Sequence, residues 1–171
     1  MLWFCLVFPQ LLLADEGLEK GFLNGFLHSR SENLGMVVEA VAEPDLVKPG
    51  SEFHLLLRVT IPEGWHIYAM HLEGDVSQLA TVVHFSQNVF PVSGKWVESS
   101  PLIEMDGVLQ MAVKSHKMSA EFSLLQKVPA NMPSGDQTIV GTMVYHACDN
   151  KVCTLPKELP FQTRVRVSGG G

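Results

Sequence analysis

Cysteine and basic residues are both scarce in this sequence. Three of its 171 residues are cysteine, and Lys and Arg total 12 against 18 Asp and Glu, which gives a formal net charge of −6. No basic cluster interrupts this acidic balance, and nucleic-acid-binding surfaces are positively charged. We therefore expect no nucleic-acid partner. The hydrophobic content of 46% and charged content of 18% indicate a globular chain, with length for one domain and a leader.

Several motifs of enzyme chemistry are absent. There is no glycine-rich nucleotide loop, no Gly-x-Ser-x-Gly elbow and no His-Glu-x-x-His motif. The Cys-x-x-Cys motif of thioredoxin, in which a helix N-terminus lowers the pKa of the first thiol, is absent as well. What remains for chemistry is a pair of cysteines with a wider spacing.

Residues 1–14 form the longest apolar stretch, and two acidic residues follow it. The stretch is shorter than the ~20 residues that cross a bilayer as a helix. Its length and small-residue end predict the core of a signal peptide, although a basic segment before it is missing. A buried strand or helix is the alternative. Cys5 would leave with the leader, so an exported chain would keep one pair, Cys148 and Cys153, as an oxidising compartment permits.

Residues 15–35 contain four glycines, each of which disfavours a helix by ~1 kcal/mol. We assign this segment as a linker that leaves room for a short helix. Residues 169–171 are all glycine and are assigned as a tail or a truncated linker.

Residues 36–168 are predicted to form one all-β domain. Alternating apolar and polar residues are typical of half-buried strands, and Lys48-Pro49-Gly50 is one of several turn signals. About eight short strands without a long helix predict an antiparallel β-sandwich. The predicted strands cover residues 36–43, 53–61, 64–70, 80–85, 107–114, 118–125, 138–147 and 159–167.

The two cysteines lie where the last two predicted strands meet. Cys148 follows the strand 138–147, and Asp149 and Asn150 are turn formers. At the mouth of such a hairpin, near-opposite Cβ atoms can approach the ~3.5–4.5 Å that a disulfide requires. A bridge across so short a loop stabilises by only ~2 kcal/mol in the chain-entropy estimate, against ~4 kcal/mol for distant strands. These residues alone leave a redox role and a structural role equally open.

Three segments together resemble a known family. They are Tyr145-x-x-Cys148-x4-Cys153-x-x-Pro156, the segment Ile61-Pro62-Glu63-Gly64-Trp65-His66-Ile67-Tyr68-Ala69, and Asp106-Gly107 followed by Lys114-Ser115-His116. In this order they resemble the N-terminal periplasmic domain of the thiol:disulfide interchange protein DsbD, of the disulphide bond corrector family. The resemblance spans roughly residues 36–167.

The resemblance implies an immunoglobulin-like fold with Cys148 and Cys153 as a redox-active, catalytic pair. It implies a component of a protein-disulfide reductase that needs no cofactor. Its partners would be a thioredoxin-like protein and a membrane electron-transfer module, which could be fused to it. Oxidised proteins of the bacterial envelope would receive the electrons, so we expect a periplasmic or otherwise extracytoplasmic location. An interaction module with a purely structural disulfide is the alternative.

Auxiliary roles are assigned to four further residues. By two-residue periodicity His146 shares a strand face with Cys148 and could stabilise its thiolate, although an exposed strand histidine is the simpler interpretation. Tyr145 faces the other way and is expected in the core. In the DsbD domain a loop bearing an aromatic residue covers the disulfide. The matching region, residues 98–104, lacks the aromatic, which leaves Leu102 or Ile103 as the shield.

Trp65 and Tyr68 are expected in the core, because large aromatics dominate sandwich interiors. A soft-metal protein binding copper or zinc is a further alternative, given seven histidines and eight methionines. Met70-His71 near His66 is the densest group, but no tight ligand pattern is present. We therefore predict no metal site.

Overall fold

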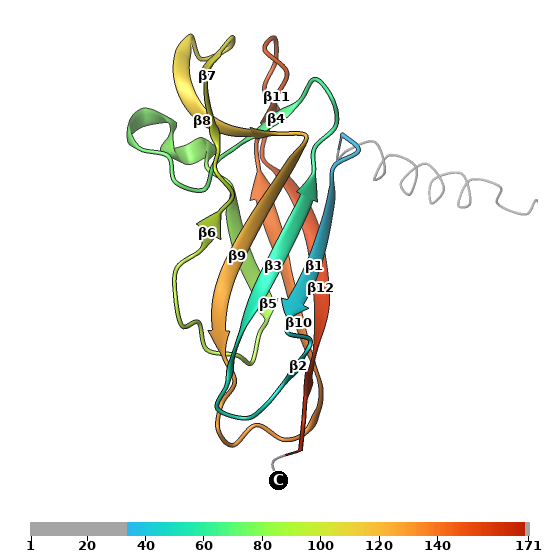
Figure 1. The fold of residues 1–171 in the computed structure, drawn as a ribbon. Helices are drawn as coiled ribbons and strands as arrows, with labels where there is room; N and C mark the ends of the chain where they lie inside the picture. Colours follow the sequence, from blue (N-terminus) through green and yellow to red (C-terminus); the bar gives the residue numbers. More distant parts are fainter. Residues whose placement is uncertain (1–33, 170–171) are drawn as a thin grey trace, which may run out of the picture. The chain divides into compact units, whose positions relative to one another are not determined.

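The computed structural model describes residues 34–169, and nearly all regular structure in this range is β (Figure 1). Its strands are β1 (Val37–Glu43), β2 (Leu46–Val47), β3 (Glu52–Thr60), β4 (His66–Tyr68), β5 (Val82–Gln87), β6 (Val97–Glu98), β7 (Leu102–Asp106), β8 (Met111–Lys117), β9 (Ser119–Lys127), β10 (Gly135–Tyr145), β11 (Ala147–Cys148) and β12 (Lys157–Val167). A 3₁₀ helix, η1 (Gly74–Leu79), lies between β4 and β5.

Two four-stranded sheets pack face to face as a sandwich. Their strand orders are β1-β3-β9-β6 and β2-β12-β10-β5. All neighbours in these sheets are antiparallel except β12 and the two-residue β2, which pair in parallel. The main hydrophobic cluster draws on β3 and β9 of one sheet and on β10 and β12 of the other. The predicted immunoglobulin-like antiparallel β-sandwich is therefore confirmed.

The alternation in the sequence explains why these strands pack as they do. In β3 the side chains of Phe53, Leu55 and Leu57 are buried, whereas His54 and Arg58 are exposed. Strands present successive side chains to opposite faces, so one face of β3 enters the core. Burying each such side chain contributes about 1.5–3 kcal/mol.

A third sheet, with strand order β11-β4-β8-β7, closes one end of the sandwich (Figure 1). Two of its strands continue sandwich strands. Between β8 and β9 lies Met118, whose φ of +62° breaks the extended backbone, and between β10 and β11 lies His146. The chain therefore passes from one sheet to another at these two residues, and the end sheet is built on extensions of the sandwich.

The end sheet is also where prediction and structure differ most. The predicted strand 138–147 stops at Tyr145, and Cys148 lies in β11, paired with β4. Strands β6 and β7 fall in or next to the region predicted as a covering loop. In β7 four consecutive side chains are exposed, so its hydrophobic pattern does not alternate and gave no strand signal.

The predictions for residues 1–14, for most of 15–35 and for 170–171 lie outside the described residues. Within residues 34–169, no helix has both the length and the hydropathy needed to span a membrane.

Gly141 in the middle of β10 provides a test of the sandwich packing. A Cβ at this position would lie 2.5 Å from Phe161 Cζ and 2.7 Å from the His84 carbonyl oxygen. Overpacking of this kind typically costs about 1–3 kcal/mol, so Gly141→Ala should lower the free energy of unfolding by that amount in urea titrations. Gly94→Ala is the matched control, because its Cβ would meet nothing closer than Leu125 Cβ at 3.6 Å. Equal stability of both variants would contradict the close packing at Gly141.

Candidate functional site

Cys148 and Cys153 form a disulfide at the mouth of the hairpin between β10 and β12. The hairpin ladder ends at the pair Tyr145 and Lys157, and the two cysteines form an isolated antiparallel bridge beyond it, with their Cα atoms 4.2 Å apart. This placement agrees with the prediction from the sequence.

Asp149 shapes the loop between the two cysteines. Its Oδ1 accepts the backbone N–H groups of Lys151 and Val152, both at 2.9 Å. These two hydrogen bonds, that from Val152 first, lower the pKa of the Asp149 carboxyl. Asn150 takes the left-handed backbone conformation with φ of +74°. The turn formers seen in the sequence thus fold the loop back upon itself.

The two sulfur-bearing residues differ in exposure. Cys148 is fully buried (0% exposed), because β11 pairs with β4 and places Cys148 opposite His66. Cys153 is only partly buried. An incoming thiol therefore finds the sulfur of Cys153 more accessible than that of Cys148.

The hydroxyl of Tyr68 lies directly against the disulfide. Its oxygen is 2.9 Å from Cys148 Sγ and 3.6 Å from Cys153 Sγ, and the hydroxyl donates to Asp106 Oδ2 at 2.7 Å. Burial, followed by the hydrogen bond to the Asp106 carboxylate, raises the pKa of Tyr68 above its usual value of about 10. Tyr68 is therefore a neutral phenol at physiological pH. It donates its hydroxyl proton to the Asp106 carboxylate while its oxygen lies against the Cys148 sulfur.

Asp106 is a buried carboxylate, only 2% exposed. Burial raises its pKa, but four hydrogen bonds outweigh burial and leave the pKa below its usual range. Oδ1 accepts the N–H groups of Val108 and Leu109, both at 2.8 Å, while Oδ2 accepts the hydroxyl of Tyr68. The fourth partner is His66 Nε2, 3.1 Å from Oδ2. The site thus holds a negative charge within hydrogen-bonding distance of the tyrosine that touches Cys148.

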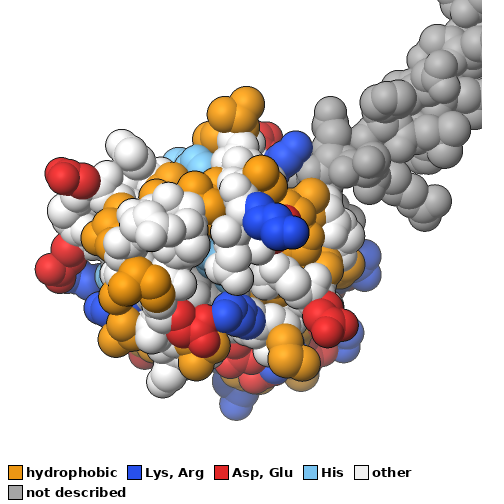
Figure 2. All heavy atoms as spheres, turned by 90° about the horizontal axis from the view of Figure 1, so that it is seen from above, with side chains coloured by type: hydrophobic (Ala, Val, Ile, Leu, Met, Phe, Trp, Pro, Cys, Tyr) orange, Lys and Arg blue, Asp and Glu red, His pale blue; other side chains and the backbone are white. Residues whose placement is uncertain are grey.

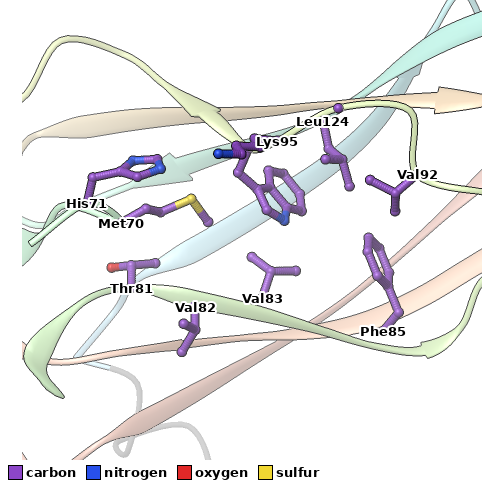
Figure 3. Close-up of a pocket in the computed structure, with 11 residues that line it drawn as sticks. Met70, His71, Thr81, Val82, Val83, Phe85, Val92, Lys95 and Leu124 are labelled. Carbon is purple, nitrogen blue, oxygen red and sulfur yellow. The ribbon is translucent and has the colours of Figure 1, made fainter. Parts of the chain in front are cut away.

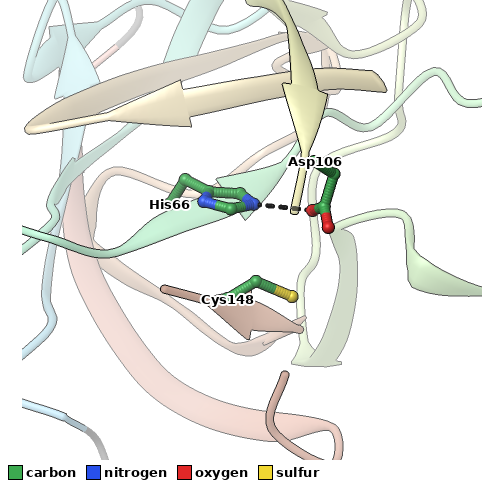
Figure 4. A group of neighbouring side chains, drawn as sticks. All are labelled: His66, Asp106 and Cys148. Carbon is green, nitrogen blue, oxygen red and sulfur yellow. Dashed lines mark hydrogen bonds and ion pairs between the residues drawn. The ribbon is translucent and has the colours of Figure 1, made fainter. Parts of the chain in front are cut away.

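The side chains of His66, Asp106 and Cys148 point toward one another from β4, the end of β7 and β11 (Figure 4). Their donor atoms all lie within 4.8 Å of one another. His66 and Tyr68 are two residues apart on β4, so both side chains lie on the same face of that strand, with their rings edge to face at 5.5 Å.

The turn that follows Asp106 packs against the cysteine loop. A Cβ on Gly107 would lie 2.7 Å from the Asn150 carbonyl oxygen and 3.2 Å from Asn150 Cβ, so only glycine fits there. Leu109 in the same turn packs against the cluster of Tyr68, Val113 and Cys148. The turn between β7 and β8 therefore packs against both the cysteine loop and the cluster that contains Cys148.

The structure also places the predicted auxiliary residues. Leu102 and Ile103 on β7 are 48% and 69% exposed, whereas Leu109 in the following turn packs on the Cys148 cluster. His146 sits between β10 and β11, and its buried Nδ1 has no hydrogen-bond partner in the structure. Tyr145 is buried in the main sandwich core, as expected.

Three residues of this site were missed by sequence reasoning: His66, Tyr68 and Asp106. Tyr68 is buried, as predicted, but it belongs to the cysteine cluster and not to the sandwich core. A signal existed, because all three lie in the two upstream segments that carry the family resemblance. The pairing of β11 with β4, which brings these segments to Cys148, was not visible in the sequence.

The Met70-His71 segment, considered in the sequence as a metal site, is hydrogen-bonded to Glu98. The backbone N–H of Met70 and the ring Nδ1 of His71 both bond the Glu98 carboxylate, at 2.8 and 3.0 Å. His116 Nε2 bonds the same carboxylate at 3.0 Å. Met70 and His71 also line a cavity of about 390 Å³ between β5 and the segment around Trp96 (Figure 3). Its lining includes none of the residues around the disulfide.

Replacing Asp106 by Asn should reveal the ionised carboxylate. A lowered folded pKa means that the carboxylate stabilises the fold fully above its unfolded pKa of ~3.9 and loses this contribution as pH falls through the folded value. We expect Asp106→Asn to reduce the free energy of unfolding at pH 7 by about 1–3 kcal/mol. The deficit should shrink in acid, where the wild-type carboxyl is protonated too.

Urea titrations of both proteins across the acid range measure this difference. The control is Asp149→Asn on the exposed cysteine loop, which should cost less, since an amide oxygen can still accept the loop N–H groups. A deficit for Asp106→Asn that stays constant with pH would contradict the assignment.

No protein-family model matches this sequence, and no curated protein matches it either. Among solved structures, the N-terminal periplasmic domain of ScsB from Proteus mirabilis aligns with a TM-score of 0.50 and 18% identity. The alignment covers 77% of this chain and 46% of that one, so this chain spans less than half of its length. The N-terminal domain of Neisseria meningitidis DsbD in the reduced form aligns with a TM-score of 0.49 and 17% identity, over 86% of this chain and 94% of that one. The fold of this chain is thus similar to that of the ScsB N-terminal domain, and the N-terminal domain of DsbD, which the sequence motifs resemble, is also among the structural neighbours.

Proposed function

We propose that this domain carries out thiol–disulfide exchange through Cys148 and Cys153. The observation that carries the proposal is the Tyr68 hydroxyl, which lies 2.9 Å from Cys148 Sγ and bonds the buried Asp106 carboxylate. A disulfide that only staples a loop has no need of a buried acid next to it. It would also stabilise by just ~2 kcal/mol, given the short loop that it closes.

The exchange begins with a partner thiolate attacking the more accessible sulfur, that of Cys153. A new bond forms between the partner's sulfur and Cys153, the bond between Cys153 and Cys148 breaks, and the electron pair stays on Cys148 as a thiolate. Tyr68 then lies between this thiolate and the Asp106 carboxylate, and its proton can turn from the carboxylate to the sulfur. Cys148 is thereby stabilised as the leaving group.

The second thiolate of the partner completes the reaction. It attacks the partner's own sulfur in the mixed disulfide, so the partner leaves as a disulfide and Cys153 is released as a thiolate. The domain has then gained two electrons, and two protons taken from the partner and the solvent make it a dithiol. The same steps in reverse reduce the disulfide of a target protein.

The surface around the disulfide suits a protein partner. Six exposed apolar side chains lie on the end sheet, in the cysteine loop or just after it: Leu102, Ile103, Met105, Met111, Val152 and Leu155. Figure 2 looks onto this end of the molecule and shows hydrophobic side chains interspersed with single acidic and basic ones. Protein interfaces combine an apolar centre with a polar rim in this way.

The partner and the direction of electron flow follow from the family resemblance. We propose that a thioredoxin-like domain, itself supplied by a membrane electron-transfer module, reduces this domain in an extracytoplasmic compartment. The domain then reduces oxidised envelope proteins and needs no bound cofactor. The periplasmic origin of the ScsB domain with the same fold supports this location.

Removing the Tyr68 hydroxyl should slow exchange without unfolding the domain. Hydrogen bonds to charged groups contribute about 1.5–3 kcal/mol, so Tyr68→Phe should slow the oxidation of reduced thioredoxin by the domain by about 10- to 100-fold. Stopped-flow fluorescence of the thioredoxin measures this rate. Tyr145→Phe is the matched control, since it alters the chain's other tyrosine, which is buried in the sandwich. Equal rates for wild type and Tyr68→Phe would sink the proposed role of Tyr68.

Single cysteine variants should show which sulfur is attacked. With a thioredoxin that lacks its resolving cysteine, Cys148→Ser should accumulate the mixed disulfide through Cys153, because Cys153 is the more exposed. Cys153→Ser should not, since Cys148 is fully buried. Non-reducing electrophoresis followed by mass spectrometry identifies the bond. A complex formed only through Cys148 would reverse this assignment, and no complex with either variant would contradict exchange itself.

A further inference from the structure

The donor atoms of His66, Asp106 and Cys148 form a compact buried group with the chemistry of a metal site. They lie within 4.8 Å of one another, and all three residues are buried. One imidazole nitrogen, one carboxylate oxygen and one sulfur are the three kinds of ligand that Zn²⁺ uses in proteins. The group differs from the Met70-His71 region that the sequence suggested.

Reduction would supply a fourth donor. In the oxidised domain Cys148 and Cys153 form a disulfide, which is a poor metal ligand. Cysteine binds metal ions as the thiolate. Once the bond is broken, the thiolate of Cys148 lies within 4.8 Å of the donor atoms of His66 and Asp106, and the thiolate of Cys153 lies beside that of Cys148. We propose that the reduced, dithiol form of this domain binds one Zn²⁺ ion through Cys148, Cys153, His66 and Asp106.

The distances suit a tetrahedral ion. Bonds of about 2.0–2.3 Å place neighbouring ligand atoms of tetrahedral Zn²⁺ about 3.3–3.8 Å apart. His66 Nε2 and Asp106 Oδ2 are already 3.1 Å apart, and the Cys148 sulfur lies within the 4.8 Å limit of both. These three donors are thus near the spacing that the ion requires, and Cys153 would turn its freed sulfur toward them after reduction.

The carboxylate is also oriented for such a role. Asp106 Oδ1 is held by the backbone N–H groups of Val108 and Leu109, which leaves Oδ2 facing His66 and the sulfur. Hydrogen bonds to the far side of a ligand typically fix its orientation in metal sites. The Glu98 cluster is a weaker candidate, because no cysteine is among the partners of that carboxylate and the ring of His71 is exposed.

The protons and electrons balance simply. A trialkylphosphine reduces the disulfide, taking oxygen from water to become a phosphine oxide and leaving two thiols. Zn²⁺ then replaces the two thiol protons, which are released to solvent. The inference needs only the dithiol form, so it stands apart from the proposed exchange with a protein partner.

The test is Zn²⁺ titration of the phosphine-reduced full chain against a chromophoric chelator, with the oxidised chain in parallel. We expect one ion per reduced chain, bound at least about 100-fold more tightly than by the oxidised chain. Co²⁺ in place of Zn²⁺ should give the intense d–d bands of a tetrahedral site together with a thiolate-to-cobalt charge-transfer band. Circular dichroism spectra of the reduced and oxidised chains serve as the control, since matching spectra show that both are folded.

Four variants separate the proposed site from adventitious thiol binding. His66→Gln and Asp106→Asn each remove one proposed ligand and should weaken Zn²⁺ binding by at least the 10- to 100-fold that the loss of an outer group typically costs. His71→Gln, at the Glu98 cluster, should bind as wild type does. Tyr68→Phe should keep the cobalt bands, because the phenol is not one of the four ligands.

Equal affinity of the oxidised and reduced chains would overturn the proposal. So would wild-type affinity in both His66→Gln and Asp106→Asn, since the two thiols alone would then hold the ion. Loss of the cobalt bands in Tyr68→Phe would overturn the four-ligand assignment. Thioredoxin oxidation by the metal-free domain is a separate measurement, so failure of either proposal leaves the other standing.

Discussion

The buried carboxylate of Asp106 is the interaction on which the end of this molecule depends. An ionised group taken out of water is costly unless it is paired and hydrogen-bonded. Here four donors from two separate segments meet on its two oxygens: two backbone N–H groups of the following turn, and the Tyr68 hydroxyl and His66 ring of β4. The charge therefore links the turn, β4 and, through Tyr68, the contact with Cys148.

This arrangement ties the cysteine pair to the rest of the fold through Tyr68. Cys148 is held from one side by the pairing of β11 with β4 and from the other by the phenol, while Cys153 remains partly open. The two cysteines of the disulfide therefore differ in their accessibility to an attacking thiolate. In the proposed exchange, Cys153 is the sulfur that a partner thiolate attacks, and Cys148 is the sulfur to which the Tyr68 hydroxyl would donate a hydrogen bond.

The sequence was sufficient for the sandwich and for the hairpin, and insufficient for the site. Alternating residues such as Phe53, Leu55 and Leu57 predict a strand because local pattern and burial agree there. No local pattern shows that the chain leaves the sheet of β10 at His146 and that β11 then pairs with β4. This pairing joins residues that are 80 positions apart in the sequence. Tyr68 is therefore predicted from the sequence as an ordinary core aromatic, and the packing of Leu109 on the Cys148 cluster is not predicted at all.

The end sheet consists of short strands continuing from long ones, with the change of sheet made at single residues such as Met118. The core and register of the long strands do not depend on which side chains the short strands have. Substitutions in β4, β7 and β11 could accordingly alter the chemistry at this end while the sandwich folds as before. The architecture thus separates the residues that form the sandwich core from the residues that surround the disulfide.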